Sequence, residues 1–294
     1  MRLTVACFAD EAEPAQRLAV ALGAPLAPVR LHRFPDGESL PVVEAPASET
    51  VVVYRSLDHP NVKLVELLLT VDAWRRAGAR RLILVAPYLC YLRQDAVFAP
   101  GEPLSRDVIC PLIGASFDAV ATVQAHLHRT LDLGAALGTS ARNLWAVESL
   151  ADALPAYASP PLVIGPDAES APWCEAWARR LGGDAVSLTK VRAGDRRVTV
   201  SGEVSAVGRP VVIIDDVASS GETLHQSIDL ARAAGAASID VAVVHALLTP
   251  RALRRLQGAG ARSIVSTDSV RHPTNAAYLA PLLAQAVNDL IEAL

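Results

Sequence analysis

The chain has 294 residues, enough for one large domain or two of ordinary size. Hydrophobic residues make up 51% and charged residues 20%, so the chain can bury a sizeable core and does not have the composition of a disordered tail. With 27 Lys and Arg against 31 Asp and Glu, the net charge of −4 argues against nucleic acid or an anionic membrane surface as a partner.

Membrane and secreted classes do not fit the sequence. No apolar run reaches the ~18 residues that a membrane span requires, and the amino terminus lacks the pattern of a secretory signal. Four cysteines are scattered along the chain without a C-x-x-C pair: Cys7, Cys90, Cys110 and Cys174. Scattered thiols in apolar stretches are typical of a reducing compartment, so we expect a cytoplasmic protein with buried, unpaired cysteines.

In chain order, short apolar runs alternate with longer amphipathic patterns. The first half of the chain predicts strands at residues 3–8, 51–55, 82–86 and 119–123. Helices are predicted between them at residues 13–22, 62–77 and 105–114. The apolar runs are continuous rather than alternating, which is typical of parallel strands covered on both faces.

A proline-rich stretch at residues 154–161 interrupts this series, which then resumes. Further strands are predicted at residues 162–165, 185–188, 211–214, 240–245 and 263–266, and helices at residues 171–181, 223–234, 250–259 and 275–294. This alternation predicts an α/β fold with two similar domains, each a mostly parallel sheet flanked by helices. We place the domains at residues 1–145 and 146–275, with residues 276–294 as a C-terminal helix that packs back on the N-terminal domain.

Lysine is rare in this chain, because only Lys63 and Lys190 among the 27 basic residues are lysines. A lysine retained in an arginine-rich chain suggests a position that needs a compact ammonium group, since the two side chains are not interchangeable. Lys190 opens a polar stretch at residues 190–197, which we expect to be a mobile loop able to close over a substrate. Lys63 lies in the middle of a helical pattern, and we expect its replacement by alanine to be nearly silent.

The strongest chemical signal lies at residues 211–231, where an apolar strand delivers Asp215 and Asp216 at its carboxyl end. A small-residue loop with Gly221 follows and opens a helix near Thr223, an arrangement typical of a phosphate cradle. Adjacent acids would repel an anion there unless they bind a diol or a divalent metal, and a phosphorylated sugar offers phosphate and diol together. The alternative interpretation is that these acids cap the helix at an ordinary strand-to-helix turn and bind no ligand.

Residues 215–223 resemble the phosphoribosyl-diphosphate loop of type I phosphoribosyltransferases and of ribose-phosphate diphosphokinases. Five further segments resemble the second family, in family order: residues 34–38 (F-P-D-G-E), 87–95 (P-Y-x-x-Y-x-R-Q-D), 122–126 (T-V-D-L-H), 165–168 (S-P-D-x-G-G) and 190–192 (K-R-R). The sequence is identified as a member of the ribose-phosphate diphosphokinase family, closer to its archaeal-type branch. The resemblance implies two domains of the type I phosphoribosyltransferase-like fold.

The resemblance also implies a reaction, in which the diphosphoryl group of ATP passes to the 1-hydroxyl of ribose 5-phosphate and gives 5-phosphoribosyl 1-diphosphate and AMP. Mg²⁺ would be the cofactor, held by His126 and Asp167 directly or through water, and the catalytic cations would be Lys190 and Arg192. ATP would be bound by Phe34, Asp36, Gly37, Glu38, Arg93, Gln94, Asp95 and His126. Ribose 5-phosphate would be bound by Arg192, Asp215, Asp216, Ser219, Ser220, Gly221, Glu222 and Thr223. The family further implies a homo-oligomer built on dimers, in which residues 34–38 complete the nucleotide pocket of a neighbouring subunit.

The sequence departs from the family pattern at a few positions of these segments. Glu222 stands where the family has a glycine, so an acid lies beside the expected phosphate cradle, and we expect its side chain to point away. Ser219 and Gln124 each replace an aspartate, and Glu169 and Ser170 replace two glycines. Each segment alone also has an ordinary explanation: an acidic turn for residues 34–38, a surface charge for Arg93, a turn or cap residue for Asp95, a satisfied histidine for His126, a helix N-cap for Asp167.

Two other functions remain open on the sequence alone. A phosphoribosyltransferase would share residues 215–223, but it leaves residues 34–38 and 93–95 and a whole α/β domain without a role. A non-catalytic regulatory paralogue of the diphosphokinase would be expected to lose its catalytic cations, whereas Lys190, Arg192 and His126 are all present.

Overall fold

A computed structural model describes residues 3–46, 48–97, 99–127, 132–167, 170–193, 197–202 and 204–294, and it describes the backbone alone at 190–193 and 197–200. The chain divides into two compact units. Met1–Trp145 and Leu279–Leu294 form unit 1, and Ala146–Tyr278 form unit 2. Both are α/β units, as the strand–helix alternation predicts. In the part of the chain described, no helix combines the length and the apolar character needed to cross a membrane.

Unit 1 is built on a seven-stranded sheet with the order β3-β2-β1-β4-β5-β6-β7. Neighbouring strands are parallel except β2 and β3, which form an antiparallel hairpin. The strands are β1 (Leu3–Phe8), β2 (Leu26–Arg33), β3 (Ser39–Val42), β4 (Thr50–Tyr54), β5 (Arg81–Val85), β6 (Ala119–Val123) and β7 (Ser140–Leu144).

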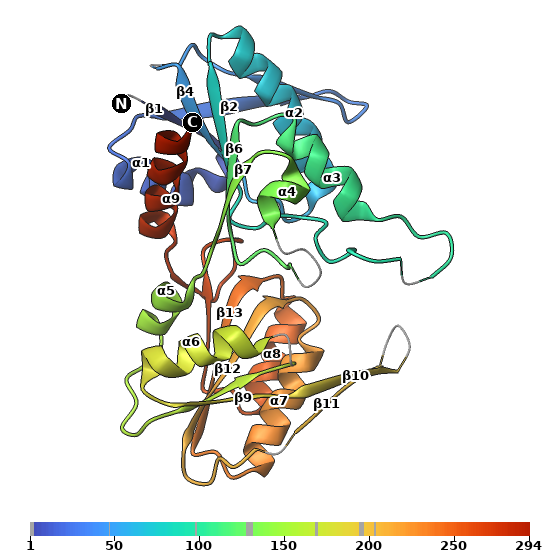
Figure 1. The fold of residues 1–294 in the computed structure, drawn as a ribbon, viewed down its shortest axis with the longest axis vertical. Coiled ribbons are helices and arrows are strands. Elements are labelled where there is room, and N and C mark those ends of the chain that lie inside the picture. The colour runs from blue at the N-terminus through green and yellow to red at the C-terminus, as the bar shows by residue number, and fades with distance from the viewer. Residues whose placement is uncertain are drawn as a thin grey trace. The chain divides into compact units, whose positions relative to one another are not determined.

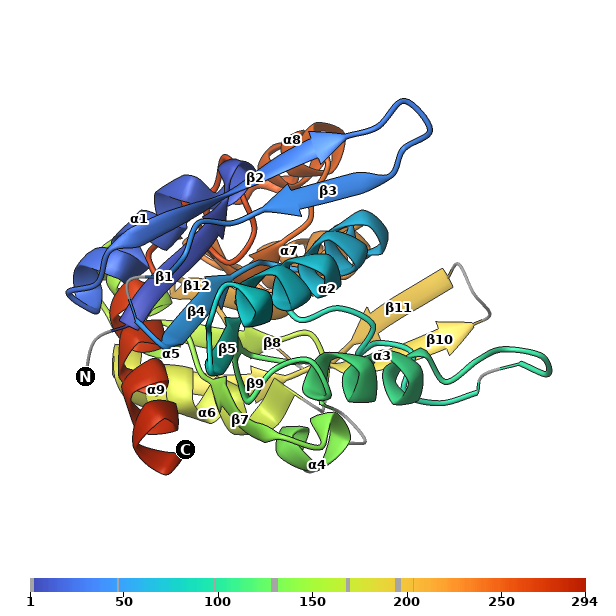
Figure 2. The same cartoon turned by 90° about the horizontal axis from the view of Figure 1, so that it is seen from above.

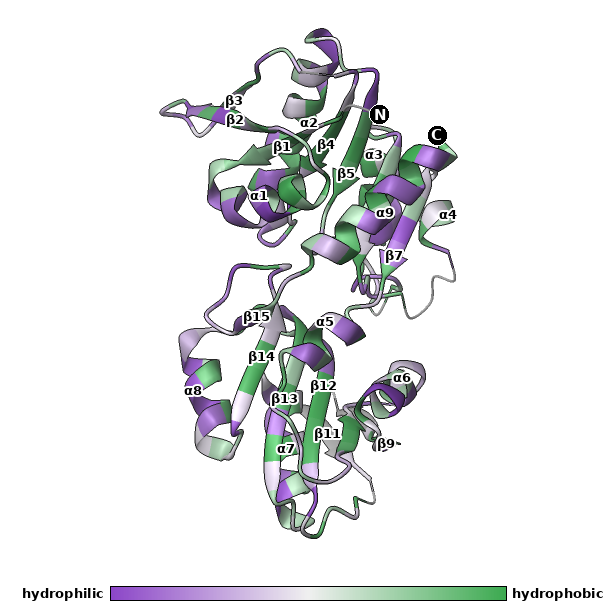
Figure 3. Ribbon diagram, turned by 90° about the vertical axis from the view of Figure 1, so that its left-hand side faces the viewer, coloured by the Kyte–Doolittle hydropathy of each residue, from purple (hydrophilic) through white to green (hydrophobic). Residues whose placement is uncertain are grey.

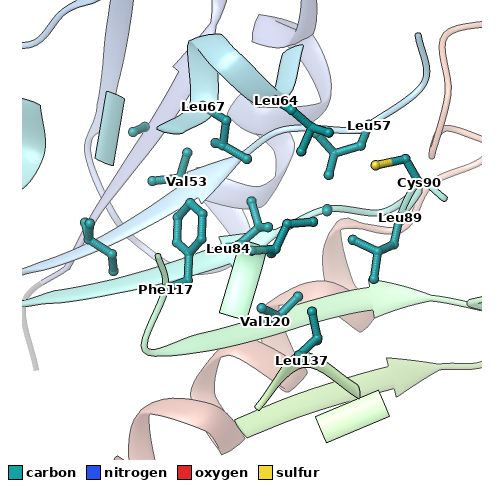
Figure 4. Packing of buried hydrophobic residues seen from close by; sticks show 14 of the residues in the cluster. Val53, Leu57, Leu64, Leu67, Leu84, Leu89, Cys90, Phe117, Val120 and Leu137 are labelled. Atoms are coloured by element: carbon teal, nitrogen blue, oxygen red, sulfur yellow. The ribbon is translucent and has the colours of Figure 1, made fainter. Parts of the chain in front are cut away.

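Helices cover both faces of this sheet. The elements are a 3₁₀ turn, η1 (Ala9–Glu11), and the helices α1 (Ala12–Ala21), α2 (Pro60–Arg76), α3 (Ser105–Gly114), α4 (Leu133–Leu137) and α9 (Ala280–Ala293). On one face, Leu64 and Leu67 of α2 pack into the same buried cluster as Val53 and Leu84 of the strands (Figure 4). On the other face α9 packs against α1, β6 and β7, and the two helices lie side by side in Figure 1.

Unit 2 repeats this design with a parallel six-stranded sheet of order β15-β14-β13-β12-β8-β9. A separate antiparallel pair, β10 and β11, projects from it as a two-stranded arm (Figure 1). The strands are β8 (Leu162–Gly165), β9 (Asp184–Ser187), β10 (Thr189–Ala193), β11 (Arg197–Ser201), β12 (Pro210–Ala218), β13 (Ser238–Ala246), β14 (Ser263–Thr267) and β15 (Asn275–Ala277).

The helices of unit 2 are α5 (Val147–Asp152), α6 (Ala171–Leu181), α7 (Glu222–Ala233) and α8 (Pro250–Ala259). Helices α7 and α8 pack together and share a core with β12 and β13, with Leu224, Ile228 and Leu256 among its buried members. The inner strands β4, β5 and β12 are hydrophobic along most of their length, whereas the helices alternate hydrophobic and hydrophilic faces (Figure 3). This pattern explains why the inner strands are visible as continuous apolar runs in the sequence.

Two expected elements differ in the structure. The helix expected at 275–294 begins only at Ala280, because the side-chain amide of Asn275 donates to the carbonyl oxygens of Thr267 and Val270 and holds Asn275–Ala277 as β15. The polar stretch expected as a loop at 190–197 is strand where the structure describes it: residues 190–193 belong to β10 and Arg197 begins β11, because the two strands pair in an antiparallel ladder, and residues 194–196 lie outside the described part.

The strand order identifies one switch point in each sheet, where the chain turns from building one side of the sheet to building the other. It lies between β1 and β4 in unit 1, and between β8 and β12 in unit 2. Open α/β sheets bind ligands outside the carboxyl ends of the strands at such points.

Candidate active site

At the switch point of unit 2, β12 leads directly into the loop that the sequence predicts as a phosphate cradle. The strand runs to Ala218, four residues beyond the predicted end at Ile214, so Asp215 and Asp216 lie in its last part, half-buried. Ser219 and Ser220 follow and are exposed. This places two carboxylates and two hydroxyl groups at one edge of the sheet, immediately before the N-terminus of α7.

Gly221 makes the turn into α7. It is the N-cap of that helix with φ of 72°, in the left-handed region that favours glycine. A Cβ atom there would lie 3.1 Å from Cδ2 of Leu248, so the site is also crowded. Since the first N–H groups of a helix have no intrahelical partner, the start of this 12-residue helix presents donors suited to an anion.

Glu222, the first residue of α7, has both carboxylate oxygens occupied. Arg255 of α8 donates to Oε2, and Nε2 of Gln226 donates to Oε1 at 3.1 Å. These hydrogen bonds, that from Arg255 above all, hold the pKa of the carboxyl below its ordinary value. The acid that stands in place of a family glycine is therefore ionised and paired with a cation on α8. Thr223 follows it, half-buried.

Asp167 lies in the segment after β8, the strand that pairs with β12. Its Oδ1 accepts a hydrogen bond from the backbone N–H of Ser170 at 3.1 Å, but the N-cap of α6 is Ser170 itself, so Asp167 is not the N-cap considered as its ordinary role. Gly165 permits the close packing beneath it, because a Cβ there would lie 2.1 Å from Oγ of Ser170 and 2.2 Å from Sγ of Cys174. Ala168 and Glu169 lie outside the described residues.

Lys190 and Arg192 lie on β10, where they pair with Val200 and Val198 of β11. Their side chains are outside the described part of the chain, so their catalytic assignment stays a prediction.

In unit 1, the residues expected to bind the nucleotide come from three connections of the sheet. Residues 34–38 form the tight end of the β2–β3 hairpin, which extends away from the rest of the unit (Figure 2). Gly37 has φ of 95°, the N–H of Phe34 donates to the carbonyl of Glu38 at 2.8 Å, and Oδ1 of Asp36 accepts from the N–H of Glu38 at 3.1 Å. The ring of Phe34 is 40% exposed and packs edge-on against His32.

The second connection, after β5, carries Arg93, Gln94 and Asp95. Arg93 is exposed and Asp95 is buried. Nε2 of Gln94 donates to Glu102 at 3.2 Å, and the carbonyl of Gln94 accepts from the N–H of Arg106 at 3.4 Å. The segment is thereby tied to the start of α3.

The third connection, after β6, carries His126, which is half-buried. It begins at Gln124, whose φ of 44° is uncommon for a non-glycine residue. The N–H of Gln124 donates to the carbonyl of Leu144 at 2.8 Å, and the N–H of Ala125 donates to Oδ1 of Asn143 at 2.8 Å. Asn143 therefore holds the backbone directly before His126. The sequence interpretation missed it because it did not predict β7.

The switch point of unit 1 is filled by a buried ion network. Arg55, whose side chain is 2% exposed, donates to Glu11 and to Glu66, and it lies over the ring of Phe8 at 4.0 Å. Nζ of Lys63 donates to Glu11 at 3.1 Å and also pairs with Asp58. Lys63 is thus a member of this network through its ammonium group, and the expectation that its replacement is nearly silent in activity stays a prediction.

The site residues are distributed over the two units. The residues expected to bind the nucleotide lie in unit 1, and those expected to bind the sugar phosphate lie in unit 2 together with Lys190 and Arg192. Within the described ranges, no group of three or more His, Cys, Asp or Glu side chains is arranged to hold a metal ion.

Comparison with known proteins identifies similar chains over the full length. Residues 3–116 match the N-terminal domain of ribose phosphate pyrophosphokinase, and residues 141–270 match a phosphoribosyl transferase domain. The ribose-phosphate pyrophosphokinase of Methanopyrus kandleri is 37% identical over 279 residues, covering 94% of this chain and 95% of the relative. Ribose-phosphate pyrophosphokinase 1 of Archaeoglobus fulgidus is 32% identical, covering 93% and 96%.

One solved structure supports the arrangement of the fold. The crystal structure of phosphoribosylpyrophosphate synthetase from Mycobacterium smegmatis superimposes with a TM-score of 0.83 at 23% identity, covering all of both chains. The fold therefore has two units of the kind expected from the sequence, each with a mostly parallel sheet flanked by helices.

Proposed function

The chain belongs to the ribose-phosphate pyrophosphokinase family, and we propose that it transfers the diphosphoryl group of ATP to the 1-hydroxyl of ribose 5-phosphate. The products are 5-phosphoribosyl 1-diphosphate and AMP. The observation that carries this proposal is the 37% sequence identity with the ribose-phosphate pyrophosphokinase of Methanopyrus kandleri. This identity extends over 94% of the chain and so includes the candidate binding segments of both units. The phosphate-type loop at the switch point of unit 2 is the structural support.

Ribose 5-phosphate binds at the end of β12. Its phosphate accepts from N–H groups at the start of α7 and from the hydroxyl groups of Ser219, Ser220 and Thr223, of which the two serines are exposed. Asp215 and Asp216 accept from the two ribose hydroxyl groups. Gly221 makes the turn that brings these donors together, because its φ of 72° favours glycine and a Cβ there would meet Leu248 and Leu256.

ATP binds to the three connections of unit 1. The guanidinium of Arg93 and the amide of Gln94 lie on a loop tied to α3, which limits their movement. Asp95 and His126 complete this group. The ring of Phe34 packs against adenine, and Asp36, Gly37 and Glu38 present acceptors for its exocyclic amine from a neighbouring subunit of a dimer.

Lys190 and Arg192 act on the transferred group. As the 1-hydroxyl attacks the β-phosphorus, negative charge spreads over the phosphoryl oxygens, and positioned cations stabilise that charge. Two cationic residues spaced two apart on the arm formed by β10 and β11 are suited to this role. Most of the rate enhancement then comes from positioning and electrostatics rather than from covalent chemistry.

Mg²⁺ is the proposed cofactor, with His126 and Asp167 as its protein ligands. When bound, it neutralises charge on the phosphates of ATP. One carboxylate and one imidazole are compatible with an ion that keeps most of its coordination for water and phosphate oxygens. Oδ1 of Asp167 is engaged by Ser170, so this carboxylate is already oriented by the start of α6.

We also propose the cytoplasm as the compartment, since all four cysteines are unpaired and buried. Burial raises the pKa of the thiols of Cys7 and Cys110 to about 11 and that of Cys90 to about 12, so these thiols stay protonated at neutral pH.

The test is incubation of the purified chain with ATP, Mg²⁺ and ribose 5-phosphate, with AMP followed by chromatography. AMP should form in the same amount as 5-phosphoribosyl 1-diphosphate, and only when the sugar phosphate is present. A regulatory paralogue would show no turnover. A phosphoribosyltransferase would instead consume 5-phosphoribosyl 1-diphosphate in the presence of a nitrogenous base, without AMP release from ATP.

A further inference from the structure

Glu222 places a negative charge at an unfavourable point for the proposed substrate. It is the first residue of α7 and directly follows the loop proposed to receive the phosphate of ribose 5-phosphate; its own N–H donates to Oγ of Ser220 in that loop at 3.3 Å. A phosphate monoester carries close to two negative charges at neutral pH. An uncompensated carboxylate in this turn would repel the substrate.

The structure shows how that carboxylate is held. Arg255 donates to one oxygen and Gln226 to the other, so the side chain is fixed between α7 and α8. Helix α8 is anchored close to the loop, because Leu256 lies next to the position that a Cβ at Gly221 would occupy, at 3.5 Å. The guanidinium of Arg255 is thus supplied by a rigid element that packs directly against the turn.

We propose that Arg255 is a positioning residue for ribose 5-phosphate, which acts by pairing with Glu222 and keeping its charge away from the phosphate loop. The inference rests on the proposed function, because it assumes that the start of α7 binds this phosphate. Arg255 itself does not contact the substrate. Its effect is electrostatic and passes through Glu222.

A purely structural role predicts different behaviour. The side chains of Arg255 and Glu222 are 44% and 41% exposed, and ion pairs at such positions contribute little to stability. An acid in the first turn of a helix is also favourable to the helix dipole without any arginine. If the pair served only to stabilise the fold, its loss would lower the melting temperature without a preference between substrates.

The test is steady-state kinetics on four proteins. Arg255→Met should raise KM for ribose 5-phosphate roughly three- to tenfold, with KM for ATP changed less than about twofold, since the Glu222 carboxylate is then uncompensated and repels a dianion. The double variant Glu222→Gln/Arg255→Met should return KM for the sugar phosphate to near the wild-type value. Arg254→Met is the matched control, because Arg254 is the exposed neighbour on the same helix, and it should leave both constants unchanged.

The outcomes separate this inference from the proposed function. Rescue by Glu222→Gln supports it, and so does a loss of the Arg255→Met effect in high salt. An unchanged KM in a folded Arg255→Met protein, or an effect that Glu222→Gln does not reverse, would overturn it. If Arg255→Met does not fold, the single variant Glu222→Gln tests the proposal by itself. A KM for ribose 5-phosphate above the wild-type value in Glu222→Gln would contradict repulsion by this carboxylate. A wild-type protein without AMP formation would instead refute the proposed function.

Discussion

Glu11 is a buried acid of the ion network in unit 1, and its titration gives a stability prediction at the scale of one residue. Burial raises the pKa of this carboxyl from 4.5 to about 7, and Lys63 and Arg55 oppose the rise. Between these pH values the folded state keeps a proton that the unfolded state has released. The free energy of unfolding should therefore fall as the pH rises from 4.5 to 7.

Glu11→Gln removes this titration. Between pH 4.5 and 7 the free energy of unfolding of the wild-type protein should fall by on the order of 3 kcal/mol relative to that of Glu11→Gln. This value follows because one unit of pKa shift corresponds to about 1.4 kcal/mol. Urea unfolding of the wild-type protein and of Glu11→Gln at several pH values measures this difference in the free energy of unfolding. Glu13→Gln is the control, because Glu13 is an exposed acid on the adjoining helix α1. Parallel curves for wild type and Glu11→Gln would contradict the assignment.

Lys190 is the cation on which the proposed chemistry depends most. Loss of one preorganised charge donor in such a site lowers kcat by roughly 10²–10³, so Lys190→Ala should fall in that range with little change in ATP binding. Lys190→Arg should not restore kcat fully, because a planar guanidinium differs in reach and geometry from an ammonium group. Retention of more than about a tenth of the wild-type kcat in Lys190→Ala would refute the role.

Lys63, the other lysine of the chain, serves as the comparison for Lys190. The structure shows that its side chain has ionic partners, which its place in a helical pattern did not indicate. Its ammonium group is 13% exposed and donates to Glu11 and to the backbone carbonyl of Ser56. Lys63→Ala removes one of the two cations that pair with the buried Glu11, so we now expect it to lower stability rather than kcat.

At the scale of elements, the connection that carries His126 depends on its neighbouring strand β7. Asn143 accepts from the N–H of Ala125, and a hydrogen bond of this kind contributes about 1 kcal/mol. Asn143→Ala should raise KM for ATP roughly three- to tenfold while KM for ribose 5-phosphate changes little. Asn143→Asp keeps an acceptor and should stay closer to wild type.

Arg142→Ala controls for general disturbance of β7, since Arg142 is its exposed neighbour. Equal increases in both KM values for Asn143→Ala, with no advantage for Asn143→Asp, would show that the strand matters only for folding.

The same elements show what the sequence could reveal. The inner strands β1, β6 and β8 have the predicted bounds because both their faces are buried and their apolar runs are continuous. The strands β2 and β7 were missed, since they are only partly buried and carry polar residues such as Arg30 and Asn143. Hairpin and edge strands form through pairing with a neighbour, and that pairing leaves no apolar run in the sequence.

The site followed the same rule. Candidate residues that lie within one segment, such as Asp215, Gly221 and Asp167, are visible in the sequence because strand, loop and helix start follow each other in the chain, and their roles stay predictions. Arg255 and Asn143 act on residues 33 and 18 positions away, through a contact that only the packing of α8 and β7 creates. No spacing in the sequence indicates such partners.

At the scale of the whole molecule, the two units repeat one design with different switch points. In unit 2 the strand ends lead to a loop of small polar residues and a helix N-terminus. In unit 1 the corresponding position is filled by Arg55, Glu11 and Glu66. This difference fits a protein in which unit 2 binds the sugar phosphate and unit 1 uses its other connections for the nucleotide.

The proposed dimer also belongs to this scale. Val62, Val65 and Leu69 form an exposed apolar stripe on α2, beside exposed Leu40 and Val42 of β3. Exposed apolar clusters of this kind are typical of protein interfaces. Light scattering on the active protein should give the mass of a dimer or a larger multiple, and Val65→Glu should lower that mass together with activity. Full activity in a monomer would contradict a pocket completed by the neighbour's Phe34.

The fate of the phosphorus atoms of ATP tests the central claim most directly. The purified protein is incubated with ribose 5-phosphate, Mg²⁺ and ATP labelled at either the α- or the β-phosphate, and the products are separated. A single diphosphoryl transfer places the β label in 5-phosphoribosyl 1-diphosphate and leaves the α label in AMP. Recovery of the β label in ADP with none in the sugar product, or of the α label in the sugar product, would contradict the account.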